Sequence, residues 1–372
     1  MEKEKSGMTY AGVGVDYGAM DPFKRLCQQA ALSTAARLSG FGFSEVESSR
    51  GESVYLIETP DCYLAHVEEG LGTKNLVADA MKEITGKGYY DAVAQCAVAM
   101  IVNDMITLGA LPVSVAMHLA VAESSWLEDP YRNMNLIEGW AGACILSGAV
   151  WSGGETPTLP DIIMPGAALL SGSALGIIRP KVSRIDPKNI CHGDRIVILL
   201  SSGIHANGLT LCRRIAAKLP DGYAAPLSDG QMYGEALLAP TYIYVPVIRD
   251  LLAQGAPIHY AVNITGHGWR KLMRANEPFV YIIERVPEIS PLFAFIQEQG
   301  PVTDKEAYGN LNMGAGFALF VPESEVGAVV AAAEKNGISA FDAGGIEKWA
   351  EEKKVIIRPK GLVYDGATLG VR

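Results

Sequence analysis

The feature that most restricts the fold of this chain is a polar segment near its midpoint, Arg179–Pro187. Its two prolines and its lack of an apolar period prevent a helix or strand from continuing through it. The chain has 372 residues, more than one ordinary hydrophobic core contains. We therefore expect two domains, residues 1–178 and 190–372, on either side of this segment.

The composition narrows the class of protein. Apolar residues make up 49% of the chain and charged residues 19%, which favours well-packed domains over disorder. A formal net charge of −10, without basic blocks, argues against a nucleic-acid partner. The charged start Met1–Lys5 does not resemble a signal peptide, and no stretch has the ~18 consecutive apolar residues of a membrane span. We expect a cytoplasmic protein that does not bind membranes and whose cysteines are reduced: Cys27, Cys62, Cys96, Cys144, Cys191 and Cys212.

Both halves contain patterns of strands and of helices, and in the second half the two alternate, as they do in a layered α/β domain. In the first half we expect a glycine-rich arm over residues 9–23, helices at Phe23–Leu38, Tyr89–Gly109 and Tyr131–Gly148, and strands at Ser53–Glu58, Cys62–Val67, Pro112–Ala120 and Ile163–Ile178. In the second half we expect strands at Asp194–Leu200, His259–Asn263, Phe317–Val321, Ser339–Ala343 and Val355–Arg358, and helices ending at Leu219, beginning near Pro240 and spanning Ser324–Asn336.

A glycine-rich loop, Glu68–Lys74, follows one of these strands and precedes a helical segment. Gly70 and Gly72 let backbone N–H groups approach a phosphate, and Lys74 adds a positive charge for the same anion. A carboxylate beside a phosphate repels it unless a divalent cation lies between them, so Glu69 indicates a metal–nucleotide site. The alternative is an ordinary glycine turn with a surface lysine.

Two further carboxylates fit the same interpretation. Asp104 lies four residues from Met100 and from Leu108, on the apolar stripe of its expected helix, where a charge is costly unless it is paired or bound to metal. Glu155 lies at the tip of a glycine turn that follows a short strand from Val150. For Asp104 the alternative is an aspartate near a helix end that bonds to the local backbone.

The second half contains two strand–loop–helix units. Ser201–Gly208 lies between an expected strand and a helix, which is the usual position of an anion at a helix N-terminus, and it contains the donors His205 and Asn207. Thr265–Gly268 occupies the same position in a later unit. The alternative is an ordinary turn with a capping asparagine.

Taken together, these segments resemble phosphoribosylformylglycinamidine cyclo-ligase, the AIR synthetase family of purine biosynthesis. The resemblance extends almost from end to end, and its motifs occur in the order of the family. They are Tyr10–Asp16, Glu69–Lys74, Val102–Asp104, Gly153–Thr156 followed by Pro160, Ser201–Gly208, Leu238–Thr241 followed by Ile243–Val245, Thr265-Gly266, and Asn312–Gly314.

The resemblance implies a two-domain α/β fold whose N-terminal sheet domains pair in a homodimer. It implies ATP-dependent, Mg²⁺-dependent ring closure of formylglycinamidine ribonucleotide, in which the amide oxygen is phosphorylated before the amidine nitrogen attacks. It places Mg²⁺ on Asp104, with Glu69 and Glu155 contributing directly or through water, and it makes His205, Lys74 and Asp104 the catalytic residues. His205 could act as an acid–base group or as a phosphate ligand. The other implied contacts are Tyr10, Gly12, Asp16, Gly70, Gly72, Thr73, Lys74 and Asn103 for the nucleotide, and Gly203, His205, Asn207, Gly208 and Thr265 for the ribonucleotide substrate.

The sequence also departs from the family pattern. Glu69 stands where aspartate is usual, and Cys96 and Met117 stand where aspartates are expected. His267 interrupts the glycine run after Thr265, and Trp269 stands where phenylalanine is usual. Two alternatives stay open on these grounds. One is a related ATP-dependent enzyme with a different small-molecule acceptor, and the other is a nucleotide-binding paralogue without catalysis.

Overall fold

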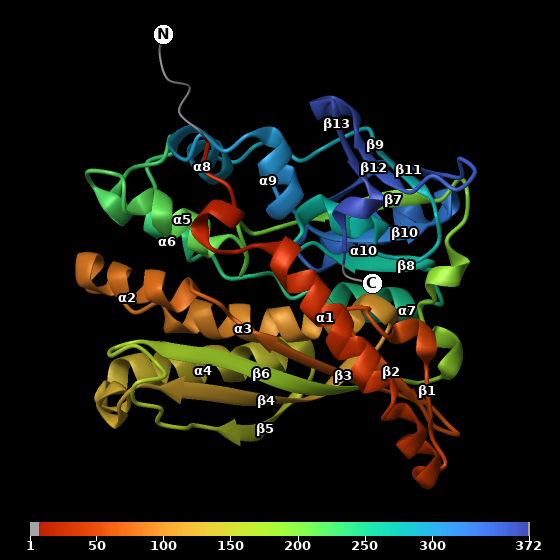
Figure 1. Ribbon diagram of the computed structural model, residues 1–372, viewed down its shortest axis with the longest axis horizontal. Helices are drawn as coiled ribbons and strands as arrows, with labels where there is room; N and C mark the ends of the chain where they lie inside the picture. Colours follow the sequence, from red (N-terminus) through yellow and green to blue (C-terminus); the bar gives the residue numbers. More distant parts are fainter. Residues whose placement is uncertain (1–6, 371–372) are drawn as a thin grey trace.

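The computed structural model describes residues 7–370 and contains two mixed β-sheets with helices packed against them (Figure 1). The first sheet has the strand order β1-β2-β3-β6-β4-β5, and the second has the order β13-β12-β9-β11-β7-β10-β8. The segment Arg179–Pro187 connects the last strand of the first sheet to the first strand of the second. The expected two-domain α/β fold is confirmed, and the charged start Met1–Lys5 lies outside the described residues.

In the first sheet all neighbouring strands are antiparallel except β4 and β5, which are parallel. Helices lie on one face of this sheet and leave the other face uncovered (Figure 1). Along β6, Leu170, Ala174 and Ile178 are buried, while Leu169 and Leu175 are exposed. The elements are β1 (Ser44–Glu45), β2 (Tyr55–Glu58), β3 (Tyr63–Gly70), β4 (Leu111–Val121), β5 (Val150–Glu155) and β6 (Ala168–Ile178), with α2 (Lys74–Thr85), α3 (Tyr90–Met105) and α4 (Pro130–Ser147).

The central helix of this domain is α3, in which most residues are buried. With the short 3₁₀ turn after it, the stretch Tyr90–Leu108 is long and apolar enough to cross a membrane, but 83% of its most apolar window is buried inside the protein. That degree of burial is typical of a core helix. The glycine at 109, with φ +84°, ends the stretch as expected.

The second sheet is antiparallel except for the β9–β12 pair. Strand β10, which pairs with the edge strand β8, has no exposed residue, so the sheet is covered on both faces there. The strands are β7 (Arg195–Leu200), β8 (Tyr260–Asn263), β9 (Val280–Ile283), β10 (Ala315–Val321), β11 (Ala340–Glu347), β12 (Lys354–Ile357) and β13 (Leu362–Asp365). The helices are α5 (Leu209–Ala216), α6 (Tyr233–Leu237), α7 (Val245–Ala253), α8 (Pro291–Gln299), α9 (Asp304–Asn310) and α10 (Val326–Lys335).

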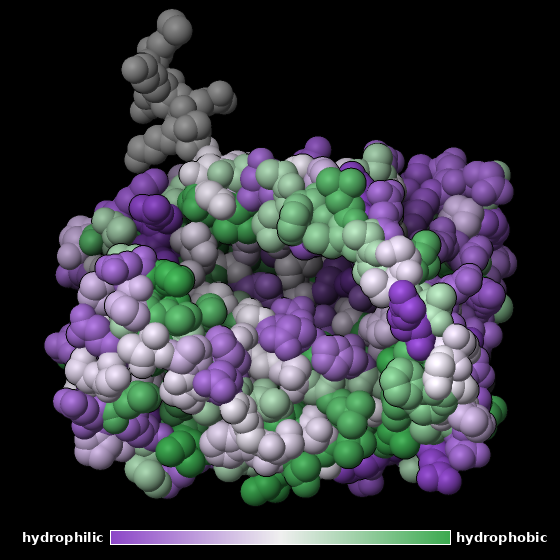
Figure 2. Space-filling model, turned by 60° about the horizontal axis from the view of Figure 1, so that its bottom comes forward, coloured by the Kyte–Doolittle hydropathy of each residue, from purple (hydrophilic) through white to green (hydrophobic). Residues whose placement is uncertain are grey.

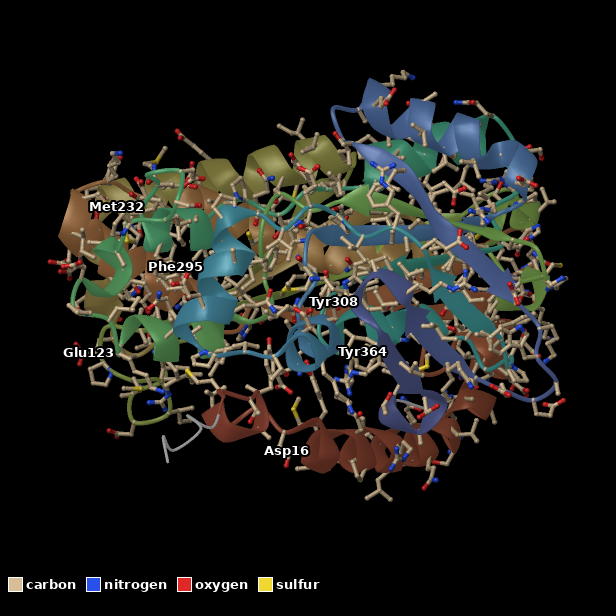
Figure 3. All side chains as sticks on the ribbon, turned by 90° about the horizontal axis from the view of Figure 1, so that it is seen from above. Asp16, Glu123, Met232, Phe295, Tyr308 and Tyr364 are labelled. Atoms are coloured by element: carbon tan, nitrogen blue, oxygen red, sulfur yellow. The ribbon has the colours of Figure 1, made fainter. Side chains whose placement is uncertain are left out.

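The N-terminal arm differs from the expectation. Instead of a loop to residue 23, a helix α1 (Tyr17–Leu32) begins at the end of a short 3₁₀ turn and runs along one side of the molecule from Asp16 (Figure 3). Asp16 caps this helix, because its carboxylate accepts the backbone N–H of Gly18 at 2.8 Å. The glycines of the arm favour a loop, so the sequence alone did not indicate that Asp16 begins a helix.

Several other element boundaries also differ. The strand expected from Ile163 begins at Ala168, and the strand from Val150 continues through its glycines to Glu155 instead of ending in a turn. The 3₁₀ helix Gly268–Met273 stands where a longer helix was expected after Thr265. The elements β1, β9, β13, α6, α8 and α9 were not predicted from the sequence, because they are short and have little periodicity.

An irregular segment of the second domain, Ala239–Tyr244, joins the two domains. Its carbonyls accept hydrogen bonds from first-domain side chains: Ala239 from Lys74 at 2.7 Å, Thr241 from Gln95 at 2.9 Å and Tyr242 from Asn103 at 2.8 Å. Asn103 also accepts the backbone N–H of Tyr244 at 2.9 Å. Because these backbone groups bond to side chains, the helix expected near Pro240 does not form, and α7 begins at Val245.

The contact between the domains makes a prediction about Asn103. Asn103→Ala leaves the partly buried carbonyl of Tyr242 and the buried N–H of Tyr244 without partners, so we expect the free energy of unfolding to fall by about 2–4 kcal/mol. Denaturant unfolding followed by circular dichroism would measure the change. Asn276 is exposed in a loop, and Asn276→Ala is the matched control, expected to change stability by less than ~0.5 kcal/mol. An equally small effect for both variants would contradict the role of Asn103 in joining the domains.

Candidate active site

A cavity of about 560 Å³ lies between the two domains and is lined by both. It is a hollow on the face of the molecule that Figure 2 shows. Nine of the residues singled out in the sequence line it: Tyr10, Glu69, Gly70, Gly72, Thr73, Asp104, Asn207, Gly208 and Thr265.

On the first-domain side the cavity is bounded by the end of β3 and the start of α2. Gly72 has a φ of +72°, which a residue with a side chain rarely adopts. Thr73 is the N-cap residue of α2, but its side chain makes no capping hydrogen bond. Its Oγ1 is buried and has no partner among the residues that the structure describes. This helix start therefore offers N–H groups and a hydroxyl to an anion.

On the second-domain side the cavity is bounded by the start of α5. Gly208, with φ +96°, is the N-cap residue and provides no side-chain cap. A Cβ at this position would lie 2.6 Å from Leu311 and 2.9 Å from Ile204, so only glycine fits. Asn207 also lines the cavity. A second uncapped helix start thus borders the same space, with N–H groups available to a second anion.

Four carboxylates line this cavity, and the charges of two of them, Glu69 and Asp104, interact. Asp104, at the end of α3, is 6% exposed, and its Oδ1 accepts a hydrogen bond from Asn263 at 2.7 Å. Burial, followed by the neighbouring charge of Asp104, raises the pKa of Glu69 to about 7, although Lys271 and Arg274 partly offset the shift. A half-buried carboxylate and a buried one whose charges interact favour a bound proton or a cation between them.

Basic residues of the second domain face these carboxylates, and the sequence analysis did not identify them. Lys271 is buried, and its Nζ donates to the backbone carbonyl of Asn263 at 3.2 Å and to the Thr265 hydroxyl. Burial lowers the pKa of Lys271, while Asp104 opposes the shift. Arg274 also lines the cavity. The only local signal was their position one turn beyond the Thr265–Gly268 loop.

Lys74 differs from its expected role. The side chain is fully buried, does not line the cavity, and donates to the backbone carbonyls of His205 at 3.0 Å and Ala239 at 2.7 Å. A lysine whose donors are used by backbone carbonyls of the other domain holds the domains together. The structure therefore does not place Lys74 as a phosphate ligand or as a catalytic group.

His205 also lies away from the cavity. Its ring is 3% exposed and lies outside the cavity, and its Nε2 accepts the backbone N–H of Ser202 at 3.2 Å. Burial, followed by the nearby charge of Lys74, lowers the pKa of His205 to about 3. The imidazole is therefore neutral at pH 7 and shielded from solvent, and neither of the two open roles, acid–base group or phosphate ligand, fits this position.

Five further residues lie away from the cavity. Asn103 bonds to the segment that joins the domains, and Gly203 lines a separate cavity in the second domain. Glu155 is exposed on β5, the edge strand of the first sheet. Within the arm, Tyr10, Val15, Tyr17 and Met20 line the cavity, whereas Gly12 is exposed and Asp16 caps α1.

The departures from the family pattern have local explanations. Cys96 accepts hydrogen bonds from the backbone and hydroxyl of Thr241, and Met117 lies on β4, so neither lines the cavity. His267 does line it, with a left-handed φ of +66°. Its ring stacks on Tyr17 of α1 with 3.7 Å between ring centres, and its Nε2 lies 3.1 Å from Asp21. His267 therefore holds α1 against the second domain.

Comparison with known proteins agrees with this arrangement. The model of the AIR synthase related protein N-terminal domain matches residues 53–178, and that of the C-terminal domain matches residues 192–355. The chain is 33% identical over 356 residues to phosphoribosylformylglycinamidine cyclo-ligase of Methanococcus maripaludis strain C6, covering 92% of this chain and 93% of the relative. It is 37% identical over 294 residues to the protein of the same name from Methanocaldococcus jannaschii, covering 78% and 80%.

Solved structures share the fold at lower identity. A chain of the HypE-HypF complex matches with a TM-score of 0.58 and 14% identity, over 84% of this chain and 92% of that one. PurL of T. maritima complexed with ADP matches with a TM-score of 0.55 and 15% identity, over 86% of this chain and 46% of that one. Both domain models match in order, on either side of Arg179–Pro187, and the motif resemblance is confirmed over nearly the whole chain. This protein therefore belongs to the AIR synthase related family.

Proposed function

We propose that this protein is a cytoplasmic cyclo-ligase that closes the imidazole ring of aminoimidazole ribonucleotide from formylglycinamidine ribonucleotide, with ATP as the second substrate. The names of the relatives support this activity. The observation that carries the proposal is one cavity in which two uncapped helix starts, at Thr73 and Gly208, meet the carboxylates Glu69 and Asp104. ATP and the ribonucleotide each carry phosphate, so the two substrates together match two anion sites. Because Cys96 and Met117 lie outside the cavity, their departures do not favour a different acceptor or a loss of catalysis.

The carboxylates fit a magnesium ion. Glu69 and Asp104 supply the oxygen ligands that Mg²⁺ prefers, and the raised pKa of Glu69 reflects negative charge that a cation would offset. Bound there, Mg²⁺ would neutralise phosphate charge during phosphoryl transfer. Glu155 is exposed at the end of the edge strand β5 and does not line the cavity, so within one chain it would not bind this ion.

The remaining cavity residues would bind and orient the substrates. The Thr73 hydroxyl and the backbone at Gly70 and Gly72 would contact the phosphates of ATP, with Tyr10 beside them. Asn207, Gly208 and Thr265 would contact the ribonucleotide. Lys271 holds the Thr265 hydroxyl and lies near both carboxylates, so it would position the acceptor and balance charge. Ring closure is intramolecular, so holding the amidine close to the activated carbon supplies much of the acceleration.

A homodimer would cover the exposed face of the first sheet. The uncovered face of its sheet exposes Leu169 and Leu175, and the edge strand β5 exposes Val150. An open strand edge and an exposed apolar sheet face favour association with another chain. We propose that two copies pair through this surface, with the cavities outside it.

Phosphate release tests the activity. With ATP and Mg²⁺, we expect formylglycinamidine ribonucleotide to stimulate phosphate release, and Asp104→Asn to reduce the stimulated rate by about 100-fold or more, since it removes a metal ligand from the reacting phosphates. Asp91→Asn, at the exposed start of the same helix, is the matched control and should keep the wild-type rate. No stimulation by this ribonucleotide in the wild type would refute the proposed substrate.

The pKa of Glu69 predicts how cation binding depends on pH. A carboxyl with a pKa of about 7 must lose its proton before it binds Mg²⁺, so affinity should rise with pH through neutrality. We expect Mg²⁺ to bind the wild type about tenfold more tightly at pH 8 than at pH 6 by isothermal titration calorimetry. Glu69→Gln removes the titrating group and should bind weakly with little pH dependence. Equal affinity at both values in the wild type would exclude Glu69 as a ligand.

The dimer makes a separate prediction. We expect the wild type to sediment at twice the mass of one chain and Leu175→Glu to sediment as a monomer, because the charge would be buried unpaired between two sheets. Val182→Glu is the matched control, because Val182 is 87% exposed in the segment between the domains. A wild type that sediments as a monomer at micromolar concentration would contradict the proposal.

A further inference from the structure

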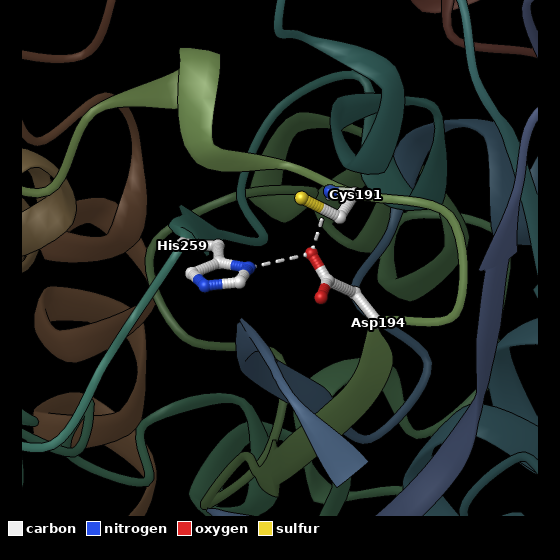
Figure 4. Close-up of side chains that lie close together, drawn as sticks. All are labelled: Cys191, Asp194 and His259. Carbon is white, nitrogen blue, oxygen red and sulfur yellow. Dashed lines mark hydrogen bonds and ion pairs between the residues drawn. The ribbon is translucent and has the colours of Figure 1, made fainter.

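Three side chains that no step above uses converge at one end of the second sheet. Cys191 and Asp194 directly precede β7, and His259 directly precedes β8. Both strands are antiparallel to β10, which lies between them, so their first residues lie at the same end of the sheet. One ligand atom from each residue, the Cys191 thiol, a carboxylate oxygen of Asp194 and a ring nitrogen of His259, lies within 4.8 Å of the other two (Figure 4).

The carboxylate at the centre of this cluster is held rigidly. Asp194 is 3% exposed, and its Oδ2 accepts the backbone N–H of Cys191 at 2.8 Å. The same oxygen lies 2.8 Å from Nδ1 of His259, whose backbone N–H is bonded to Phe320. The Cys191 thiol is exposed and bonds only to the carbonyl of Asn189 at 3.1 Å among the described contacts, so it can turn towards the other two ligand atoms.

We propose that Cys191, Asp194 and His259 bind one zinc ion, with water as the fourth ligand. Thiolate, imidazole and carboxylate together are zinc ligands, whereas Mg²⁺ prefers oxygen alone. Tetrahedral zinc with bonds of about 2.0–2.3 Å separates its ligand atoms by roughly 3.3–3.8 Å. The cluster reaches that geometry by a small opening of the His259–Asp194 pair and a rotation of Cys191. The thiol proton goes to solvent, and the imidazole keeps its one proton on Nε2.

Zinc here would act on the architecture of the chain and not on the proposed reaction. None of the three residues lines the cavity between the domains. Cys191 belongs to the connection between the two sheets, and His259 directly precedes β8, an edge strand of the second sheet. A zinc ion would therefore tie the connecting segment to the sheet and stabilise the second domain.

Cobalt binding to the reduced, metal-free full-length protein tests the proposal. We expect one equivalent of Co²⁺ to produce thiolate-to-cobalt charge-transfer absorption and the visible bands of four-coordinate cobalt, and one equivalent of Zn²⁺ to abolish both. Zn²⁺ should also raise the melting temperature of the wild type. Because changes outside the ligand set already weaken metal affinity by about 10–100-fold, loss of a direct ligand should weaken it by about tenfold or more.

Two variants and one control distinguish a metal site from a hydrogen-bonded cluster that binds no metal. Cys191→Ser should lose the charge-transfer absorption and the zinc-dependent rise in melting temperature. His259→Asn keeps a donor near Asp194 but lacks the ligand nitrogen, and it should bind Co²⁺ about tenfold or more weakly. Cys27→Ser changes the other exposed cysteine and should match the wild type. The proposal is overturned if the wild type shows no charge transfer, or if Cys191→Ser retains it.

Discussion

The arrangement of the two domains depends on a buried ammonium group. Lys74 is fully buried at the start of α2 and has two backbone carbonyls of the second domain as partners. A buried charge without such partners costs several kcal/mol, so the domains cannot separate or slide without losing them. Because Lys74 directly follows Thr73, the same contact fixes the start of α2 beside the cavity. The contacts of Lys74 that dock the domains therefore also fix the position of the anion site.

The electrostatics of the cavity follow from this docking. Asp104 comes from the core helix of the first domain, whereas Asn263 and Lys271, which stabilise it, come from the second. Negative charge from one domain thus meets positive charge from the other in a space that excludes much of the solvent. Charges in such a space interact more strongly than in water, which suits chemistry on phosphate groups. Neither domain alone contains the complete set.

Local chemistry explains which site residues the sequence could predict. The sequence could predict that Gly72 and Gly208 belong to the site, because a positive φ and an uncapped helix start are properties of a few adjacent residues. Lys74 and His205 were assigned to ligands because their motif suggested it, but their burial depends on packing between segments more than a hundred residues apart. Lys271 was missed since its only local signal is its position after the Thr265–Gly268 loop. In the fold, long apolar elements such as α3 were predicted well. The helix α1 and the segment before α7 were misassigned because capping and distant side chains determine their structure.

The cavity is also bordered by residues from both ends of the described chain. Tyr10 and Tyr17 line it together with Leu369, and Arg25 of α1 donates to the carbonyl of Gly370. During synthesis, the first domain and α1 leave the ribosome long before residue 369 is added. The site therefore cannot be completed while the chain is still growing through its second sheet.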